Sequence, residues 1–521
     1  MKKMKRWKKV LLGILAVLLI LVAGAFLVVR RMFSQPSIDK AAASENAVVQ
    51  TDKGLLRGSE ENDVYQYLGV PYAQATRRFE PAQEVPAWDG IRDTTQVSAM
   101  SPQSGMLGMS AGSQQGTDNN CQNLNIWTPG IDDGKKRAVM VWLHGGGFSS
   151  GTANSEQYNG AALSQAGDVV VVSVNHRLGV SGYLDLSAYG AEYRYSANAG
   201  LDDLVKALQW IHTNIEAFGG DPDNVTLFGQ SGGGAKILAL MTTPYAKGLF
   251  QRGIVQSGAT ETMGVTFTHK EASQRLTEHI LENLGLNGQN VEELQTRPLD
   301  EIETAAQTAL QQTAEEYKIP APLTDGYAME WGPVVEGEYL PTDPVTADGF
   351  AESGRDVELL IGSNLNEWTM FMGGDQGTLT AEETAAFAQA YPMKDTAKAN
   401  KVDTLIRLPM LKIMSHKADQ NGAAVYAYVF TYDNNRSGAY HGAEIPFVFR
   451  HMDGENAALA AQISDAWVNF AKTGVPGAEG LPQWEPYDRE RAATMLLDTT
   501  STLVYGHDKQ LMQLLAPNYQ Y

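Results

Sequence analysis

Six runs of strand length, mostly apolar and without polar–apolar alternation, are spread over the middle of the chain. They are Ala138–Leu143, Val169–Val174, Val225–Phe228, Gly253–Ser257, Val357–Gly362 and Val425–Phe430. A strand with one face in water alternates polar and apolar residues, whereas runs without alternation are typical of strands that are covered on both faces. Because parallel sheets are covered in this way, the runs predict a mostly parallel central sheet.

Amphipathic helices are predicted between these runs. The clearest one places apolar residues at 3/4 spacing on one face: Leu201, Leu204, Leu208, Ile211, Ile215 and Phe218. Asn198 is positioned to cap its start, and Gly219-Gly220 with Pro222 ends it. A βα unit follows this helix: it consists of the strand 225–228, a glycine turn and the helical segment "AKILALM". The sequence therefore predicts a doubly wound α/β fold, with helices flanking the sheet.

The pattern G-x-S-x-G occurs three times, around Ser110, Ser149 and Ser231. The chain contains 51 glycines, so chance matches are expected and the context has to decide. Only Ser231 lies between a buried strand and a helix, where a sharp turn lifts the side chain out at the carboxyl end of the strand. No strand precedes Ser110, and Ser149 belongs to a different glycine motif. Ser231 is therefore the predicted nucleophile.

That other motif is "WLHGGGF", which spans Trp142–Phe148. Successive glycines let backbone N–H groups converge on one point without Cβ atoms in the way, as an oxyanion hole requires. Gly146 and Gly147 are the predicted donors, joined by the N–H of Gly232. A flexible glycine loop without such a function is the alternative.

A serine nucleophile also needs a base and an acid that orients the base. His441 lies in "GAYHGAEIPFVF", shortly after the strand 425–430, at the end of the sheet where Ser231 is expected. A histidine with a purely structural role is the alternative. Glu367, in "IGSNLNEWTMF", follows the strand 357–361, whereas Asp356 and Glu358 fall at its opposite end. The order Ser231, Glu367, His441 fits the α/β-hydrolase arrangement.

Taken together, these segments resemble the type-B carboxylesterases, the carboxylesterase/cholinesterase family of α/β-hydrolases, and especially its bacterial para-nitrobenzyl-esterase-like members. The resemblance runs from about Val48 to about Pro486. The matching segments follow in order: "YLGVPYAQ…RRFEPAQEVPAWDG", "CQNLNIWTP", "VNHRLGVSGYL", "NAGLDDLVKALQWIHTNIEAFGGDPDNVTLFGQSGGG", "IVQSG" and "WVNFAKTGVP".

The resemblance implies an α/β-hydrolase fold with long insertions around an active-site gorge. It implies hydrolysis of carboxylic esters by Ser231, Glu367 and His441 through an acyl-enzyme, with no metal and no cofactor. Lipase, lactonase or amidase activity on the same triad stays open, as does a non-catalytic cholinesterase-like binding domain. Ser257 is expected to support the acid by a hydrogen bond, with a plain packing role as the alternative.

The sequence departs from the family pattern at several positions. Gln230 stands before the nucleophile where Glu is usual, which puts a preference for cationic, choline-like esters in doubt. Gly232 replaces the usual Ala but still supplies an N–H, and Trp368 follows the acid where Gly is common. Asn119-Asn120 replace an acidic pair before Cys121, the single cysteine, so no intramolecular disulfide and no cysteine-based metal site can form.

The N-terminus predicts a membrane segment. Residues 1–34 contain eight Lys/Arg and no acid, and six of these cations precede an uncharged, largely apolar run of 20 residues, Val10–Val29. That length spans a bilayer core as a helix, and the flanking charge favours a cytoplasmic N-terminus. A cleaved signal peptide ending near Ala23–Ala25 is the alternative. Either way, the remaining chain is expected outside the cytoplasmic membrane.

The expected organisation is a signal-anchor over residues 1–34, a short linker over 35–47 and one hydrolase domain over 48–521. Residues 35–521 contain 32 basic and 60 acidic side chains, a formal net charge of −28. Such a body repels nucleic acid and anionic surfaces, so the expected partners are a small-molecule ester and, through the N-terminus, the membrane. The sequence makes no prediction of the oligomeric state.

Overall fold

The computed structural model describes residues 36–103, 116–259, 261, 266–321, 326–368, 377–433 and 438–521. The predicted signal-anchor, 1–34, and Ser110 lie outside these residues. Across the described ranges, no helix has both the length and the apolar character needed to cross a membrane. Residues 36–47, within the predicted linker, contact the body: Ile38 is buried and its N–H donates to the carbonyl of Asn154 over 2.9 Å.

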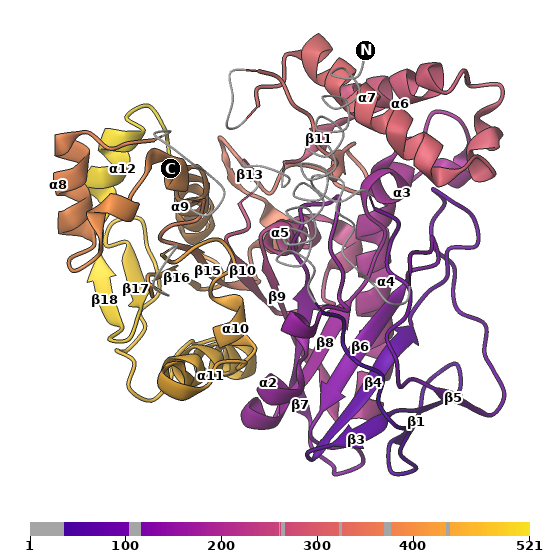
Figure 1. The fold of residues 1–521 in the computed structure, drawn as a ribbon, viewed down its shortest axis with the longest axis horizontal. Helices are drawn as coiled ribbons and strands as arrows, with labels where there is room; N and C mark the ends of the chain where they lie inside the picture. Colours follow the sequence, from indigo (N-terminus) through magenta and orange to yellow (C-terminus); the bar gives the residue numbers. More distant parts are fainter. Residues whose placement is uncertain are drawn as a thin grey trace, which may run out of the picture.

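A central sheet of 11 strands runs through the described part of the chain (Figure 1). From one edge to the other its order is β18 (Thr502–Tyr505), β17 (Ala493–Leu497), β16 (Val425–Phe430), β15 (Glu358–Asn364), β10 (Arg252–Gln256), β9 (Gly220–Gln230), β7 (Arg137–Leu143), β8 (Val170–Val174), β6 (Asn123–Thr128), β4 (Val64–Pro71) and β3 (Ser59–Glu61).

The sheet is mixed. Its centre, from β17 to β8, is parallel, and all six predicted strands lie there, so those predictions are confirmed. The pairs β17–β18, β8–β6, β6–β4 and β4–β3 are antiparallel, which the sequence patterns did not predict. The central strands are unbroken apolar runs because both of their faces are covered by helices, as the burial of every residue of β7, β8 and β16 shows.

Two groups of helices cover the sheet (Figure 1). α4 (Ala199–Asn214) and α5 (Gly232–Thr242) contact each other and β9, whereas α2 (Ala161–Gly167) and α11 (Ala457–Thr473) contact each other on the other side of the sheet. α9 (Thr404–Asp419) packs on β15 and β16. The remaining α-helices of the described ranges are α3 (Gly179–Tyr183), α6 (Lys270–Asn283), α7 (Leu299–Tyr317), α8 (Ala381–Ala390), α10 (Ile445–Val448) and α12 (Lys509–Leu515).

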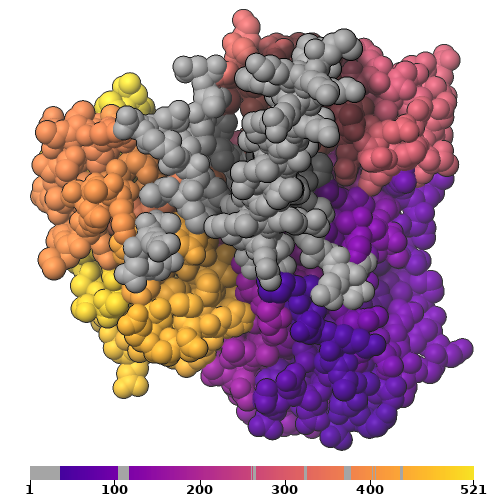
Figure 2. Space-filling view, in the orientation of Figure 1, coloured from indigo at the N-terminus to yellow at the C-terminus, as the bar shows by residue number. Residues whose placement is uncertain are grey.

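Short strands complete the fold in three small sheets. One contains β1 (Val48–Gln50), β2 (Leu55–Arg57) and β5 (Ile91–Asp93). The other two pair β11 (Thr268–His269) with β12 (Val334–Val335) and β13 (Val345–Thr346) with β14 (Gly349–Phe350). In the space-filling view, the C-terminal third, coloured orange to yellow, lies beside the indigo-to-magenta N-terminal half (Figure 2).

The predicted helix 198–218 is α4 continued by one 3-10 turn, Ile215–Phe218, and its apolar face is buried as expected. Asn198 occupies the N-cap position, but its side chain does not cap the helix. It donates to the carbonyl of Val334 and accepts from the N–H of Val334, both over 2.9 Å, so tertiary pairing replaces the expected cap.

A buried ion pair holds α4 against the end of β8. The guanidinium of Arg177 donates to both carboxylate oxygens of Asp203 over 2.8 Å, and both side chains are fully buried. The backbone N–H of Arg177 donates to the same carboxylate over 3.0 Å. This geometry is bidentate, which satisfies the hydrogen-bonding groups of two charges that would be costly to bury separately.

Candidate active site

Ser231 lies in the sharp turn between β9 and α5, so its predicted placement between a buried strand and a helix is confirmed. Its backbone has φ 56° and ψ −125°, a conformation that L-residues rarely adopt. The N–H of Ser231 donates to the carbonyl of Gln256 over 2.8 Å, which fixes the turn against β10. A Cβ atom on Gly233 would overlap the carbonyl of Leu143, so only glycine permits this close approach of α5 to β7.

Ser149 lies elsewhere, in the turn that follows β7. Its N–H donates to the carbonyl of Gly146 over 3.3 Å, and the next α-helix, α2, begins only at Ala161. It therefore lacks the strand–turn–helix context that exposes Ser231.

The glycine loop lies against the start of α5. A Cβ on Gly145 would be 3.4 Å from the Cβ of Ser231, and one on Gly232 would overlap the carbonyl of Gly147. Gly146 and Gly147 have φ 90° and 61°, which favours glycine at both positions. Within the described residues, the N–H groups of Gly146 and Gly147 donate to no hydrogen bond, and the N–H of Gly232, at the first position of α5, has no partner inside the helix. Three backbone donors thus remain available beside Ser231.

His441 and Glu367 are brought together by the parallel strands that precede them. β15 and β16 pair so that Asn364 is opposite Phe430, and both following loops emerge at the same edge of the sheet as Ser231. His441 Nδ1 lies 2.7 Å from Glu367 Oε2, and the N–H of His441 donates to the carbonyl of Glu367 over 3.0 Å. Glu367 is fully buried, and its other oxygen accepts from the N–H of Asn364 over 2.8 Å.

The electrostatics suit a base held by an acid. Burial by itself lowers the pKa of His441, but the hydrogen bond to Glu367 and the charges of Glu367 and Glu444 outweigh burial, so the pKa lies above the ordinary 6.5. No hydrogen bond joins Ser231 Oγ to His441 Nε2 in the described structure, and such contacts are frequently long in enzymes without bound substrate.

Trp368 stacks on the imidazole of His441, with ring centroids 5.0 Å apart and an interplanar angle of 16°. The backbone N–H of Trp368 donates to Asp403 Oδ1 over 3.0 Å. The large residue that replaces the family's usual glycine therefore leaves the pairing of acid and base intact and covers one face of the imidazole.

Glu444 is a site residue that the sequence reasoning missed. Its buried carboxylate accepts from Asn364 Nδ2 over 2.6 Å and from Gln256 Nε2 over 3.0 Å. Burial raises the pKa of Glu444, partly offset by these hydrogen bonds. The available signal was an acidic residue three positions after His441 in an otherwise apolar segment.

Gln230 and Ser257 lie close to the site. A Cβ on Gly442 would be 3.6 Å from Gln230 Nε2, and one on Gly145 would be 3.1 Å from Gln230 Oε1, so the amide lies between the glycine loop and the His441 loop. In the described structure Gln230 Nε2 and Ser257 Oγ have no hydrogen-bond partner. Support of the acid by Ser257 therefore stays a prediction.

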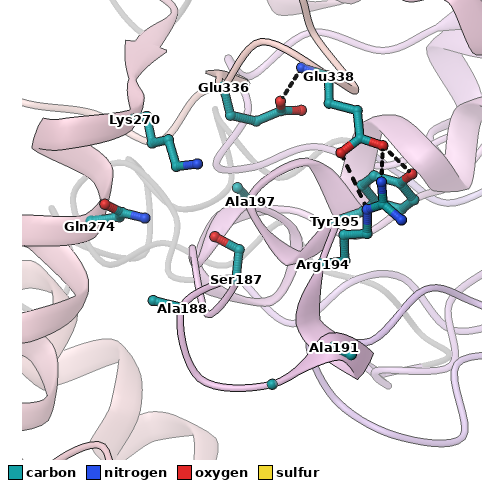
Figure 3. Close-up of a pocket in the computed structure, with 11 residues that line it drawn as sticks. Ser187, Ala188, Ala191, Arg194, Tyr195, Ala197, Lys270, Gln274, Glu336 and Glu338 are labelled. Atoms are coloured by element: carbon teal, nitrogen blue, oxygen red, sulfur yellow. Dashed lines mark hydrogen bonds and ion pairs between the residues drawn. The ribbon is translucent and has the colours of Figure 1, made fainter.

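No group of three or more His, Cys, Asp or Glu side chains suited to hold a metal ion occurs in the described ranges. A surface cleft of about 370 Å³ contains none of the predicted site residues (Figure 3). In it Arg194 pairs with Glu338, which also accepts from the hydroxyl of Tyr195 over 3.0 Å. These groups satisfy one another, and no nucleophile–base pair is formed by the residues drawn there.

Comparison with known proteins places this geometry in context. A profile of the carboxylesterase family matches residues 45–401 and 391–514. The para-nitrobenzyl esterase of Bacillus subtilis (strain 168) is 33% identical over 506 residues, which cover 90% of this chain and 99% of that protein.

Two solved structures of esterases are also similar to this chain. An esterase of Clostridium hathewayi, described as hydrolysing aliphatic aromatic polyesters, has a TM-score of 0.80 and 33% identity over 92% of this chain and 100% of its own. A solved PNB esterase has a TM-score of 0.75 and 31% identity over 90% of this chain and 99% of its own.

Proposed function

This chain belongs to the carboxylesterase family and hydrolyses carboxylic esters as a serine hydrolase, and from that premise we propose that Ser231, His441 and Glu367 form its catalytic triad. The likeness to solved esterases identifies the mixed sheet and its helices as an α/β-hydrolase fold. The observation that carries the proposal is the 2.7 Å contact between His441 and the buried Glu367, at the same sheet edge as the Ser231 turn.

In the proposed mechanism, Ser231 Oγ attacks the ester carbonyl while His441 Nε2 takes the hydroxyl proton. The new O–C bond turns the carbonyl oxygen into an oxyanion, which accepts from the N–H groups of Gly146, Gly147 and Gly232. When the C–O bond to the alcohol breaks, His441 returns the proton to the leaving oxygen. Water, deprotonated by the same base, then releases the acid from the acyl-enzyme, and Glu367 stabilises the charged imidazole in both halves.

The test uses the second described G-x-S-x-G serine as a matched control. Ser231→Ala should lower kcat by about 10⁴-fold or more, the scale of triad nucleophiles, and should no longer be labelled by an organophosphonate. Ser149→Ala should retain both turnover and labelling. Turnover by Ser231→Ala near the native rate, or labelling that persists in it and disappears in Ser149→Ala, would overturn the assignment.

For the substrate we propose uncharged esters that have an aromatic part. The names of the relatives support this class: one is a para-nitrobenzyl esterase and another is described as hydrolysing aliphatic aromatic polyesters. The neutral amide of Gln230 lies where other family members have a carboxylate, so nothing at that position attracts a cationic alcohol. A panel of benzyl, alkyl and choline esters of one acyl chain separates these classes, and a dominant choline activity would refute the proposal.

For the N-terminus we propose that residues 1–34 anchor the body on the outer side of the cytoplasmic membrane. The support is the basic cluster before the 20-residue apolar run Val10–Val29. Protease added to intact cells should digest the body and leave a membrane-bound fragment of about 35 residues. A mature chain that begins near Phe26 would show a cleaved signal peptide instead.

A further inference from the structure

Lys236 is a fully buried lysine on α5, five residues after Ser231. Its Nζ donates to the carbonyl of His144 over 2.9 Å and lies 5.6 Å from the ring centroid of Phe148. His144 and Phe148 are the two residues that flank the glycines of the oxyanion loop. One side chain on α5 therefore contacts both ends of the loop.

No carboxylate forms an ion pair with Lys236 in the described part of the chain, and burial lowers the pKa of its amine. Its titratable neighbours are instead the rings of His144 and His176, which stack with centroids 4.9 Å apart. Burial and the Lys236 charge lower the pKa of His144 to about 3 and that of His176 well below its ordinary value, so both rings are neutral. An amine buried beside neutral rings is costly to the fold, so stability does not explain its presence.

The loop that Lys236 contacts needs an external restraint. Gly145, Gly146 and Gly147 have no side chains to hold them, and glycine has the widest choice of backbone conformations. An oxyanion hole works only if its donors are fixed before the reaction. Two of the proposed donors are on this loop, whereas the third, Gly232, and the nucleophile are at the start of α5.

We propose that Lys236 is a positioning residue for the oxyanion hole, which ties the loop 144–148 to α5 through the His144 carbonyl and the Phe148 ring. The inference rests on the proposed function, because it takes the N–H groups of Gly146, Gly147 and Gly232 as the oxyanion donors. Lys236 acts through the loop and not on the substrate. Its loss therefore weakens transition-state binding more than ground-state binding.

The test compares two buried lysines in the full chain. Lys236→Met keeps the length and volume of the side chain but removes the donor, and Lys236→Gln keeps an N–H donor. Lys417→Met is the matched control. Lys417 lies on α9, away from the site, and it is also fully buried and donates to two carbonyls, those of Arg355 and Ala423. The readouts are kcat, KM and the inhibition constant of a trifluoromethyl ketone, which forms a tetrahedral oxyanion with the serine.

We expect Lys236→Met to lower kcat by about 10- to 100-fold, at or below the ~10²–10³-fold cost of removing a donor outright, because the donors are displaced and not lost, with KM within about two-fold. The inhibition constant of the ketone should rise by the same factor by which kcat/KM falls. Lys236→Gln should recover part of kcat, and Lys417→Met should match the native enzyme.

Native kcat in Lys236→Met, an equal loss in Lys417→Met, or a loss confined to KM would overturn the inference. Should Lys236→Met fail to fold, Lys236→Gln decides: a partial loss of kcat with equally weakened ketone inhibition at native KM upholds the positioning role, whereas native kcat/KM with native ketone inhibition, or a loss confined to KM, refutes it. Failure of the proposed function looks different, because Ser231→Ala would then remain active.

Discussion

Replacing Lys236 by Met should make the protein more stable at neutral pH, by an amount that depends on pH in a defined direction. Burial lowers the pKa of Lys236 from 10.5 to about 7. Each tenfold change in proton affinity is worth ~1.36 kcal/mol, so the charged amine costs the folded state about 5 kcal/mol below pH 7. Methionine has a similar volume and no charge, but it leaves the buried carbonyl of His144 without its donor, which costs about 1–3 kcal/mol. The expected net gain in unfolding free energy at pH 6 is therefore about 2–4 kcal/mol.

The sign of the pH dependence follows from proton binding. Between pH 7 and 10.5 the unfolded chain holds a proton on Lys236 that the folded chain has lost, so native stability rises with pH in that window. The Met variant lacks this contribution. The difference between the two proteins should thus be greatest below pH 7 and should shrink steadily towards pH 10.5. His144 and His176, whose pKa values the Lys236 charge also lowers, stay neutral through burial over this range, and groups that Lys236 does not influence cancel.

The assay is reversible urea unfolding of both proteins at pH 6, 8 and 10. Leu240→Met, a buried swap on the same helix without a titrating group, is the control and should give a difference that does not vary with pH. A stability difference between Lys236→Met and the native chain that is constant over this range would refute the reasoning. So would a variant that is less stable than the native protein at pH 6.

Three further outcomes are expected. Because the pKa of His441 lies above its ordinary value, kcat/KM should fall as the pH is lowered, with a midpoint above 6.5. Glu367→Gln should lower this midpoint and reduce kcat by about 10³–10⁴-fold. A midpoint that does not move in the pH profile of this variant would contradict the account. Gln230→Glu should shift the kcat/KM ratio of a choline ester to its uncharged carbon isostere by about five-fold towards choline, and an unchanged ratio would exclude a role for this position in charge selection. Asp203→Asn should lower the unfolding free energy by about 3–5 kcal/mol in urea titrations, because it leaves the buried charge of Arg177 without its partner; a loss below about 1 kcal/mol would contradict that account.

The sequence predicted the centre of the sheet because its strands are buried on both faces and leave a clear apolar pattern, as in Val425–Phe430. It did not predict the antiparallel strands. β3 and β18 are short and partly exposed and carry a weak pattern, and β6, although fully buried, has polar residues between its apolar ones in Asn123–Thr128. Glu367 and His441 could be proposed because a polar residue just after a buried strand lies at a known edge of the sheet. Lys236 and Glu444 could not, because charged residues are usually exposed and only the packing of the folded chain reveals their burial.

The order of the strands also has a consequence for folding during synthesis. Ser231 follows β9 and His441 follows β16, and β10 and β15 lie between them in the sheet. A growing chain can form the turn around Ser231 long before the proposed base and acid have left the ribosome. Because domains of this length fold largely as units and their distant strands pair late, the chain remains inert towards esters until nearly all of it has been synthesised. With the proposed triad, hydrolytic competence is thus a signature of completed folding.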